Sequence, residues 1–353
     1  MSRFIQLHLL TSYPPANLNR DDLGRPKTAK MGGSDRLRVS SQSLKRSWRT
    51  SDLFQHALAG HLGVRTKVRG VSIYHALVDG NLSEKNSKKW AQAIAGQFGK
   101  LKKESPDSVT QDLEIEQLVH ISASENAAID ALVAVLIAEQ REPDEEELAL
   151  LRKEEMAADI AMFGRMLASK PSFNVEASCQ VAHAISVHSI VIEDDYFTAV
   201  DDLNDGSEDA GAAHIGETGF AAGLFYSYIC INKELLIENL NGEKALANKA
   251  LGAFVEAAVK VAPEGKQNSF ASRAYASYAL AESGNQQPRS LSVAFLKPVS
   301  KNSDDFATEA VVALEKQKDN FDRVYGDCAD ANYSFNAITG EGSLKELLAF
   351  VSE

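Results

Sequence analysis

The chain has 353 residues, of which 44% are hydrophobic and 24% charged, so it can bury a sizeable core and is not expected to be disordered. Its longest strongly apolar stretch, 129–138, is about half as long as a membrane span of about 20 residues, and its start lacks the pattern of a signal peptide. Three cysteines, Cys179, Cys230 and Cys328, lie far apart and argue against a disulfide framework or a metal site. We therefore expect a cytoplasmic protein without a membrane partner.

Charge is unevenly distributed along the chain, whose formal net charge is −12. Residues 1–100 hold 17 Lys and Arg against 6 Asp and Glu, whereas residues 101–353 hold 20 against 43. Because charges are screened beyond about 8–10 Å, a phosphate responds to the local surface and not to the net charge. The basic first part therefore favours a nucleic-acid surface, and a solvated basic face with acidic neighbours is the alternative.

The first half of the chain predicts a strand, a loop, a helix and a helical block. Residues 3–13 alternate apolar and polar side chains, as a strand does, and the Pro- and Gly-containing segment 14–39 predicts a long loop. A helix is expected to begin after a serine N-cap, Ser40 or Ser41. Residues 64–170 are poor in strand signals and predict helices, including 123–140 and 143–167.

The second half returns to strands. The β-branched segment 179–195 and the segment 220–232 predict strands on either side of an acidic, Gly-rich tip at 201–219. An amphipathic helix is predicted at 242–263, and the later elements are expected to be strands at 269–282 and 291–299 and a terminal helix at 343–351. Without the helical block, the order is close to β-α-β-β-α-β, which is typical of ferredoxin-like and RRM folds. We therefore expect an α+β fold with a helical insertion.

The segment "RLRVSSQSLKRSWR", from Arg36 to Arg49, concentrates positive charge at the predicted helix. At about 100° per residue, Gln42, Lys45, Arg46 and Arg49 fall within an arc of about 100°, and the apolar side chains lie on the other side. Serines at the helix start add hydroxyl and N–H donors, which attract anions. Six cations precede the helix and are expected on the same loop: Arg20, Arg25, Lys27, Lys30, Arg36 and Arg38. Together these residues predict a phosphate-binding surface. The glycines at 32–33, which lack a side chain, would let a ligand approach the backbone there closely.

RNA-binding proteins usually add apolar or aromatic side chains that stack on bases. Met166 follows the helical block, and Tyr196 and Phe197 precede the acidic tip. Taken singly, each is better explained as part of a core than as a ligand contact. An aromatic pair beside a charged hairpin is the better candidate for a base contact.

The segment "LNRDDLGRPKTAKMGGSDRLRVSSQSLKRSWR" resembles the N-terminal signature of the CasC-type backbone subunits of type I-E CRISPR Cascade complexes, which belong to the RAMP superfamily. The blocks "GRMLAS", "VAHAISVH", "YFTAVDDL" and "AHIGETGFAAGLFYSYICIN" resemble later parts of that family in the same order. The similarity is dense over 1–55 and 160–235 and weak in the helical block and the C-terminal third.

The resemblance implies a modified RRM-like palm, helical fingers and a β-hairpin thumb. The expected boundaries are palm at 1–63, 171–189 and 223–353, fingers at 64–170 and thumb at 190–222. Copies of such a subunit polymerise along a CRISPR RNA guide into a helical filament, in which the thumb of one copy crosses the guide beside its neighbour. The base at each crossing is flipped out, and the stretches between crossings pair with target DNA.

The resemblance also implies which residues bind the guide. The positions that match guide-phosphate contacts are Asn19, Arg20, Lys27, Ser40, Gln42, Lys45, Arg46 and Arg49. Met166, Tyr196, Phe197 and Thr198 match the wedge at the kinked base, and it stays open whether Tyr196 or only Phe197 touches that base. Lys85, Lys88, Lys89, Lys100, Lys102 and Lys103 are a compositional guess for contacts with target DNA.

The implied protein is a non-catalytic subunit of an antiviral ribonucleoprotein, without a cofactor or a metal. Its expected partners are the crRNA guide, the target DNA strand, adjacent copies of itself, and the large, small, guide 5′-end cap and guide-processing endoribonuclease subunits. Two alternatives are a metal-dependent ribonuclease that uses Asp21, Asp22 or Asp35, and a helix-turn-helix DNA-binding regulator that uses the helix at 41–58.

Overall fold

The computed structural model describes residues 2–199, 214–300 and 302–352. The chain folds into two compact units. The first, here the sheet unit, comprises Met1–Phe54, Val181–Ile231 and Leu251–Glu353; the second, the helical unit, comprises Gln55–Gln180 and Asn232–Ala250. None of the described helices is both long and apolar enough to cross a membrane.

The sheet unit is built on four strands in the order β10-β1-β9-β7. Their bounds are Ala276–Gly284 for β10, Phe4–Ala16 for β1, His214–Asn232 for β9 and Ala184–Ser186 for β7. Helix α1 (Ser41–Arg49) follows β1, and α8 (Lys244–Lys260) follows β9. The chain order is therefore β-α-β-β-α-β, and the spatial order of strands, fourth-first-third-second, is that of the ferredoxin-like and RRM folds. The predicted fold class is confirmed.

Further strands extend the sheet at both edges. Strand β11 (Ala331–Asn336) pairs with β10, and the hairpin of β2 (Thr28–Met31) and β3 (Ser34–Val39) extends the sheet beyond β7. The prediction of one long loop at 14–39 is therefore wrong. Gly32 and Gly33, at φ +59° and +76°, form the two-residue turn of the β2–β3 hairpin, where a left-handed backbone matches the twist of the strands.

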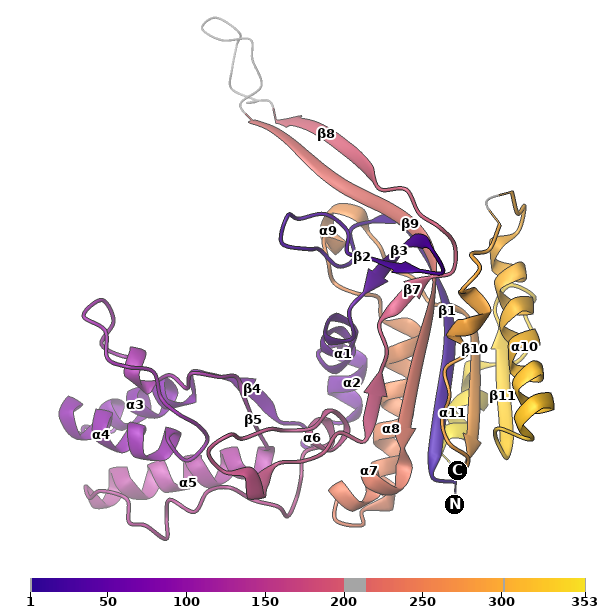
Figure 1. The fold of residues 1–353 in the computed structure, drawn as a ribbon. Coiled ribbons are helices and arrows are strands. Elements are labelled where there is room, and N and C mark those ends of the chain that lie inside the picture. The colour runs from indigo at the N-terminus through magenta and orange to yellow at the C-terminus, as the bar shows by residue number, and fades with distance from the viewer. Residues whose placement is uncertain (1, 200–213, 301, 353) are drawn as a thin grey trace, which may run out of the picture. The chain divides into compact units, whose positions relative to one another are not determined.

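Both faces of the sheet are covered, which is why seven successive residues of β1 are buried, from Ile5 to Thr11. Helices α8 and α10 (Phe306–Tyr325) lie on opposite sides of β1 and β10 (Figure 1). On the α10 side, Leu10, Tyr226 and Leu280 pack with Leu291, Phe295 and Leu314 into one apolar core. The segment 291–299, predicted as a strand, contains the 3-10 helix η3 (Ser292–Phe295), because Leu291 and Phe295 must both point into this core.

Near its C-terminal end the sheet unit carries two more short elements. Helix α9 (Gln267–Phe270) occupies the start of the segment predicted as a strand at 269–282, so that strand begins only at Ala276. Helix α11 (Leu344–Ser352) confirms the terminal helix, with Leu347 and Val351 buried.

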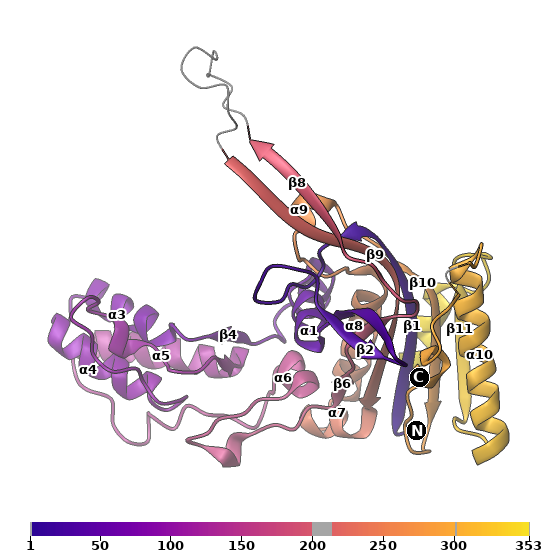
Figure 2. The ribbon, with the colours of Figure 1, turned by 45° about the horizontal axis from the view of Figure 1, so that its top comes forward.

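A long hairpin of β8 (Glu193–Ala199) and the first half of β9 extends beyond the rest of the sheet, as Figures 1 and 2 show from two directions. Strands on either side of the acidic tip are confirmed, but their bounds differ from the prediction. The segment 179–195 holds three separate strands, of which β8 starts only at Glu193, and β9 begins at His214, inside the predicted tip. The rest of that tip, 201–213, lies outside the described residues.

The helical unit packs three main helices, α3 (Arg69–Asp79), α4 (Glu84–Ala95) and α5 (Ala123–Glu139), around Leu77, Trp90, Ile94 and Leu136. The smaller elements are β4 (Val64–Thr66), β5 (Val119–Ile121), η1 (Gln111–Leu113), α6 (Ala158–Phe163), η2 (Pro171–Phe173), β6 (Cys179–Val181) and α7 (Lys233–Asn239). Helix α5 starts with a capping box of Ser122 and Glu125 and confirms the helix predicted at 123–140.

The prediction of a helix at 143–167 is wrong, because one buried carboxylate holds this segment in another conformation. Glu125 accepts hydrogen bonds from the Arg152 backbone N–H at 3.0 Å and from the Arg165 guanidinium at 2.7 Å. Leu150 and Leu151, directly before the first anchor, reach the core, and between the two anchors only α6 is helical. Tertiary contacts therefore override the helical pattern of the sequence.

Candidate nucleic-acid interface

Helix α1 separates a polar face from a buried one, as its sequence predicts. Leu44 and Trp48 are buried, and the Trp48 indole donates to the Val261 carbonyl at 3.2 Å. The helix is capped by Ser40, whose hydroxyl accepts the Ser43 N–H at 3.3 Å. Helix α1 ends at Arg49, and α2 (Asp52–Ala57) follows after a break at Thr50, so the helix predicted at 41–58 is two helices.

The segment 17–27 folds into a tight loop beside the start of α1. Arg20 and Pro26 form a β-bridge, and the Lys27 N–H donates to the Asn19 carbonyl at 2.8 Å. The Asp21 carboxylate caps the tip by accepting the Leu23 and Arg25 N–H groups, each at 2.9 Å. This loop replaces part of the long loop expected from the sequence.

Asn19 joins the loop to the helix. Its side-chain oxygen accepts the Ser40 N–H at 2.9 Å, so two predicted phosphate contacts hold each other in place. Ser40 is buried, and its hydroxyl is used as the helix cap. The structure therefore confirms Ser40 as the expected N-cap of α1 and gives Asn19 a positioning role for this helix, which the sequence did not predict.

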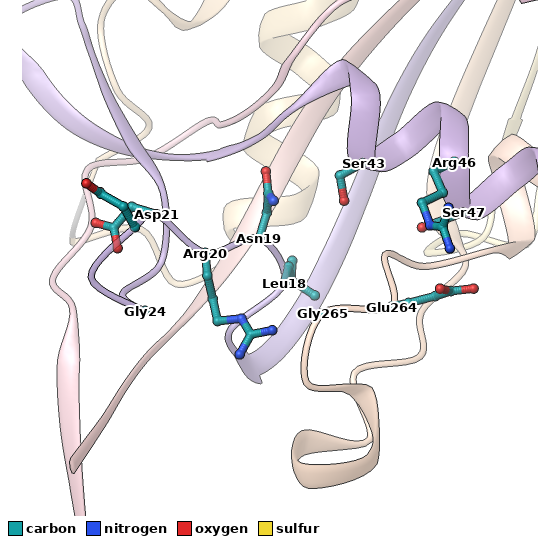
Figure 3. Close-up of a pocket in the computed structure, with 11 residues that line it drawn as sticks. Leu18, Asn19, Arg20, Asp21, Gly24, Ser43, Arg46, Ser47, Glu264 and Gly265 are labelled. Atoms are coloured by element: carbon teal, nitrogen blue, oxygen red, sulfur yellow. The ribbon is translucent and has the colours of Figure 1, made fainter. Parts of the chain in front are cut away.

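An open cavity of about 570 Å³ lies between the loop and α1. Figure 3 shows Arg20 from the loop and Ser43 and Arg46 from α1 around this space. Its other lining residues are Leu18, Asn19, Asp21, Asp22, Gly24, Ser47, Glu264 and Gly265. The lining also holds three carboxylates, so an anion such as a phosphate is suited only to the part of the cavity beside Arg20, Ser43 and Arg46, whose groups can donate hydrogen bonds.

The cations of this surface differ from other cations of the chain in their partners. Arg20, Lys27, Lys30, Lys45 and Arg46 form no ion pair with the part of the chain that the structure describes. In the helical unit, by contrast, Lys88, Lys89, Lys100 and Lys102 all lie within 3.0 Å of a carboxylate oxygen. Four of the six lysines guessed as target-DNA contacts are thus already paired, whereas Arg20 and Lys27 of the loop and Lys45 and Arg46 of α1 keep their charge for a ligand.

The remaining predicted phosphate contacts lie on α1 as the helical arc requires. Gln42 and Arg46 are exposed, and Lys45 and Arg49 are half-buried. Lys27 is half-buried at the end of the loop. The loop and α1 together form one polar surface, here called the loop–helix surface, which comprises Arg20, Lys27, Gln42, Ser43, Lys45, Arg46 and Arg49.

Arg36 does not belong to this surface, although it lies in the most basic stretch of the sequence. Its side chain is fully buried, and its guanidinium donates to the carbonyls of Ser186 at 2.9 Å and Phe295 at 2.8 Å. The expectation that Arg36 adds a phosphate-binding cation is wrong. Gly32 likewise serves the protein's own packing, since a Cβ there would lie 1.6 Å from the Leu296 carbonyl oxygen.

His183 is a residue of this region that sequence reasoning missed. Its Nδ1 accepts the Ser41 N–H of α1 at 3.2 Å and lies 3.5 Å from an Arg38 guanidinium nitrogen. Burial, together with Arg38 and Lys27, lowers the pKa of His183. The histidine is therefore neutral in this site and adds an acceptor, not a charge. Only the spatial pairing of β3 with β7 brings it there.

The hairpin separates the predicted wedge residues onto two faces. In the β8–β9 register, Tyr196 faces Glu217, Phe197 faces Gly216 and Thr198 faces Ile215. Since side chains alternate along a strand, Tyr196 and Thr198 lie on one face of the hairpin and Phe197 on the other. Both aromatic side chains are accessible, Tyr196 at 65% and Phe197 at 43% of full exposure.

Gly216 provides the seat for the Phe197 ring. A Cβ on Gly216 would lie 2.3 Å from the ring, so the aromatic side chain rests directly on the glycine backbone. On the other face, the Arg25 guanidinium donates to Asp194 at 2.9 Å and ties the loop 17–27 to the hairpin.

Met166 belongs to the helical unit and is exposed to 76%. It lines a cavity of about 330 Å³ together with Phe98, Leu118 and Leu167, and with Lys100 at its edge. An exposed methionine beside an apolar hollow fits a contact with a base or another apolar group.

The features required by the two alternative functions are not brought together. No group of three or more His, Cys, Asp or Glu side chains in the described ranges could hold a metal ion, and Asp21 caps its own loop. Helix α1 packs on a sheet and not in the three-helix context of a helix-turn-helix domain.

Comparisons with known proteins agree with this geometry. A chain of a solved structure described as a "CRISPR RNA-guided surveillance complex, pre-nicking" is 27% identical, with a TM-score of 0.83 over 99% of this chain and 100% of that one. A second, described as a "CRISPR RNA-guided surveillance complex", shares the fold at 24% identity, with a TM-score of 0.73 over 98% and 99% of the two chains. No curated protein matches. The family model for CT1975-like proteins matches residues 5–347, in line with the resemblance seen in the sequence, and this chain therefore belongs to the CT1975-like protein family.

Proposed function

We propose that this chain is a non-catalytic, guide-RNA-binding backbone subunit of a type I-E CRISPR Cascade complex. Copies polymerise along the crRNA and present its segments for pairing with a target DNA strand. The observation that carries the proposal is the loop–helix surface, whose cations Arg20, Lys27, Lys45 and Arg46 have no carboxylate partner in the described ranges. Membership of the CT1975-like family supports the same function.

The phosphates of the guide lie along the loop–helix surface in this proposal. Arg46 and Arg20 offer planar donor groups that bind phosphate oxygens in pairs, and Ser43 and Gln42 add uncharged donors. Asn19 and Ser40 act through the loop and helix that they join. Phosphate contacts of this kind fix the position of a nucleic-acid strand.

The sheet itself does not offer the usual RRM binding surface. RRM domains stack bases on aromatic side chains of an open sheet face. Here that role is closed to Tyr226 and Tyr278, which are buried under η3 and α10. Base contacts are assigned instead to the exposed hairpin residues, Phe197 with Tyr196 and Thr198, and to Met166.

In this proposal the sheet unit is the palm, the helical unit the fingers and the β8–β9 hairpin the thumb. The partners are the guide, the target strand, neighbouring copies, and the large, small, guide-capping and guide-processing subunits. The solved structures with this fold are parts of CRISPR RNA-guided surveillance complexes, which supports such an assembly.

A charge-reversal experiment tests the proposal. We expect Arg20→Glu with Arg46→Glu to abolish the RNA that co-purifies with the protein, because two cations at the cavity become anions. The matched control is Lys316→Glu with Lys345→Glu, which changes the net charge equally at exposed positions of α10 and α11. Co-purified RNA is measured by the absorbance ratio at 260 and 280 nm and then sequenced.

The control separates local from general electrostatics. RNA loss in both double variants would mean that only the net charge matters, and RNA retention in both would remove the loop–helix surface from the proposal. Sequences without CRISPR repeats in the bound RNA would contradict the assignment to a guide.

A further inference from the structure

We infer that Lys266 binds a phosphate of the guide next to the nucleotide whose base lies on Phe197. The inference deepens the proposed function and rests on it. It extends the RNA path from the loop–helix surface to the hairpin through a segment, 264–271, that carries no nucleic-acid signal in the sequence.

The segment 264–271 lies beside the cavity of the loop–helix surface. Glu264 and Gly265 line the cavity together with Arg20 and Arg46. Gly265 is packed so closely that a Cβ on it would lie 2.1 Å from the Leu18 carbonyl oxygen. The backbone of the segment is therefore held against the loop 17–27, and Lys266 follows at the edge of the cavity.

Lys266 contacts the β8–β9 hairpin through its side chain. Its ammonium donates to the Thr218 hydroxyl at 3.3 Å. In the hairpin Thr218 pairs with Asp195, and Gly216 pairs with Phe197 two residues further along each strand. Side chains two residues apart on a strand, and those of directly paired residues, point to the same face, so Thr218 and Phe197 lie on the same face. Two residues apart on a strand corresponds to about 7 Å, which is comparable to the distance from a phosphate to its own base.

The opposite face of the hairpin has a different neighbour. There Arg25 binds Asp194, and a Cβ on Gly219 would touch Pro26, so the loop 17–27 covers the Tyr196 face. On the Phe197 face, Phe220 packs with Phe270 at 6.1 Å between ring centroids. The segment 264–271 and the loop 17–27 thus hold the root of the hairpin from both sides, and Lys266 is the cation on the side of Phe197.

The charge of Lys266 has no counter-ion within the described ranges. Within the described ranges, its ammonium meets a neutral hydroxyl and no carboxylate closer than 4 Å. It shares this property with Arg20, Lys27, Lys45 and Arg46 of the loop–helix surface. A half-buried ammonium that has only a hydroxyl as partner gains a stronger interaction when a phosphate oxygen arrives.

The backbone is strained at both ends of α9. Lys266 and Ala271, which flank the single turn of α9, have φ values of +45° and +49°. Residues with a Cβ rarely adopt this left-handed conformation, and such strain tends to collect at functional sites. A glycine would adopt the same conformation without cost, so the presence of a lysine at this position favours a use for its side chain.

The strain also makes a sharp experiment available. We expect Lys266→Gly to melt at or above the temperature of the wild type while it binds a labelled single-stranded RNA of about 12 nucleotides about tenfold more weakly. The slope of log affinity against log salt concentration should fall by about 0.7, the value for one lost phosphate contact on a single strand. Lys266→Arg should restore both readouts to within about twofold.

Two controls exclude a merely structural role. Thr218→Val removes the hydroxyl that holds Lys266 but keeps the ammonium, and its RNA affinity is expected to lie within about twofold of the wild type. Lys345→Ala removes a lysine on α11, away from the hairpin, and its RNA affinity is also expected to lie within about twofold. The role of Lys266 is overturned if Lys266→Gly leaves affinity and salt slope unchanged, or if Lys266→Arg or Thr218→Val binds as weakly as Lys266→Gly. Wild-type protein that binds no RNA would overturn the proposed function itself.

Discussion

At the residue scale, Glu282 is the centre of a buried polar network in the sheet. It accepts the His8 ring at 3.0 Å and two hydrogen bonds from the Arg289 guanidinium, at 2.6 and 2.9 Å. His8 in turn lies 2.9 Å from the Tyr226 hydroxyl. Because β1, β9 and β10 each supply a member, the network fixes these strands relative to one another.

Replacing this carboxylate is predicted to destabilise the sheet unit. Glu282→Gln removes the main counter-ion of the half-buried Arg289 and leaves only Asp322, at 3.7 Å, so the cost is expected to be up to about 3–5 kcal/mol. Thermal unfolding followed by circular dichroism should show a clearly lower midpoint. The matched control Glu309→Gln, at an exposed position of α10, should differ little from the wild type. Equal midpoints for all three proteins would contradict a structural role for the network.

The same network makes stability depend on pH. Burial lowers the pKa of His8, opposed by the Glu282 hydrogen bond, so this histidine takes up a proton more readily in the unfolded chain, whose pKa is about 6.5. Burial alone would raise the pKa of Glu282, but His8 and Arg289 hold it at about 2. His8 therefore contributes fully above about pH 6.5 and less below it, and Glu282 contributes fully above about pH 4.3 and less towards pH 2.

We expect the free energy of unfolding to fall as the pH drops from 7 to 5, by at most about 1.4 kcal/mol per pH unit for the one proton of His8. His8→Gln should lower stability at pH 7 and flatten this part of the profile. Denaturant unfolding at several pH values measures it. A variant with the same slope as the wild type would assign the pH dependence to other groups, such as His188, whose pKa burial also lowers.

At the element scale, the alternation of the hairpin bears on which aromatic residue meets the kinked base. Phe197 and Tyr196 point to opposite faces, so a single base stacks on one of them only. We predict that Phe197→Ala and Tyr196→Ala change the chemical reactivity of different nucleotides in the bound guide, one on each side of the hairpin. Both variants should retain their RNA, because the phosphate contacts remain. Changes at identical nucleotides would contradict the separation of the two faces.

The elements that the sequence predicted well are those with a pattern of their own. Helix α5 begins with a capping box, α1 has a serine cap and two clear faces, and β1 and β9 alternate or carry β-branched residues. The segments 143–167 and 291–299 were predicted wrongly because distant partners, Glu125 and the core under α10, decide their conformation. No local pattern contains that information.

The residues of the candidate site also fall into those that the sequence predicted and those that only the fold reveals. The arc of Gln42, Lys45 and Arg46 followed from helical geometry alone. Arg36 did not, because a basic stretch does not tell which cation turns inward to bind carbonyl groups. His183 and Lys266 lie far from α1 in the sequence, and only the folded sheet brings them to the loop 17–27 and to the hairpin.

At the scale of the whole molecule, the uneven charge of the sequence takes on a spatial meaning. In the helical unit, four lysines are paired with nearby carboxylates, Lys88, Lys89, Lys100 and Lys102, whereas four cations of the loop–helix surface have no ion pair in the described ranges: Arg20, Lys27, Lys45 and Arg46. An acidic remainder repels nucleic acid elsewhere on the chain and directs it to this surface. Net charge alone would have argued against RNA binding.

The sheet face closed by η3 and α10 has a consequence for how a guide is chosen. On an open RRM sheet, aromatic side chains stack on two or three bases and neighbouring groups bind their edges, so the sheet can favour particular RNA sequences. A subunit whose sheet face is filled by Phe295, Leu314 and their neighbours has no such reading surface there. In the proposed function, a guide of new sequence can then be bound without any change in the protein.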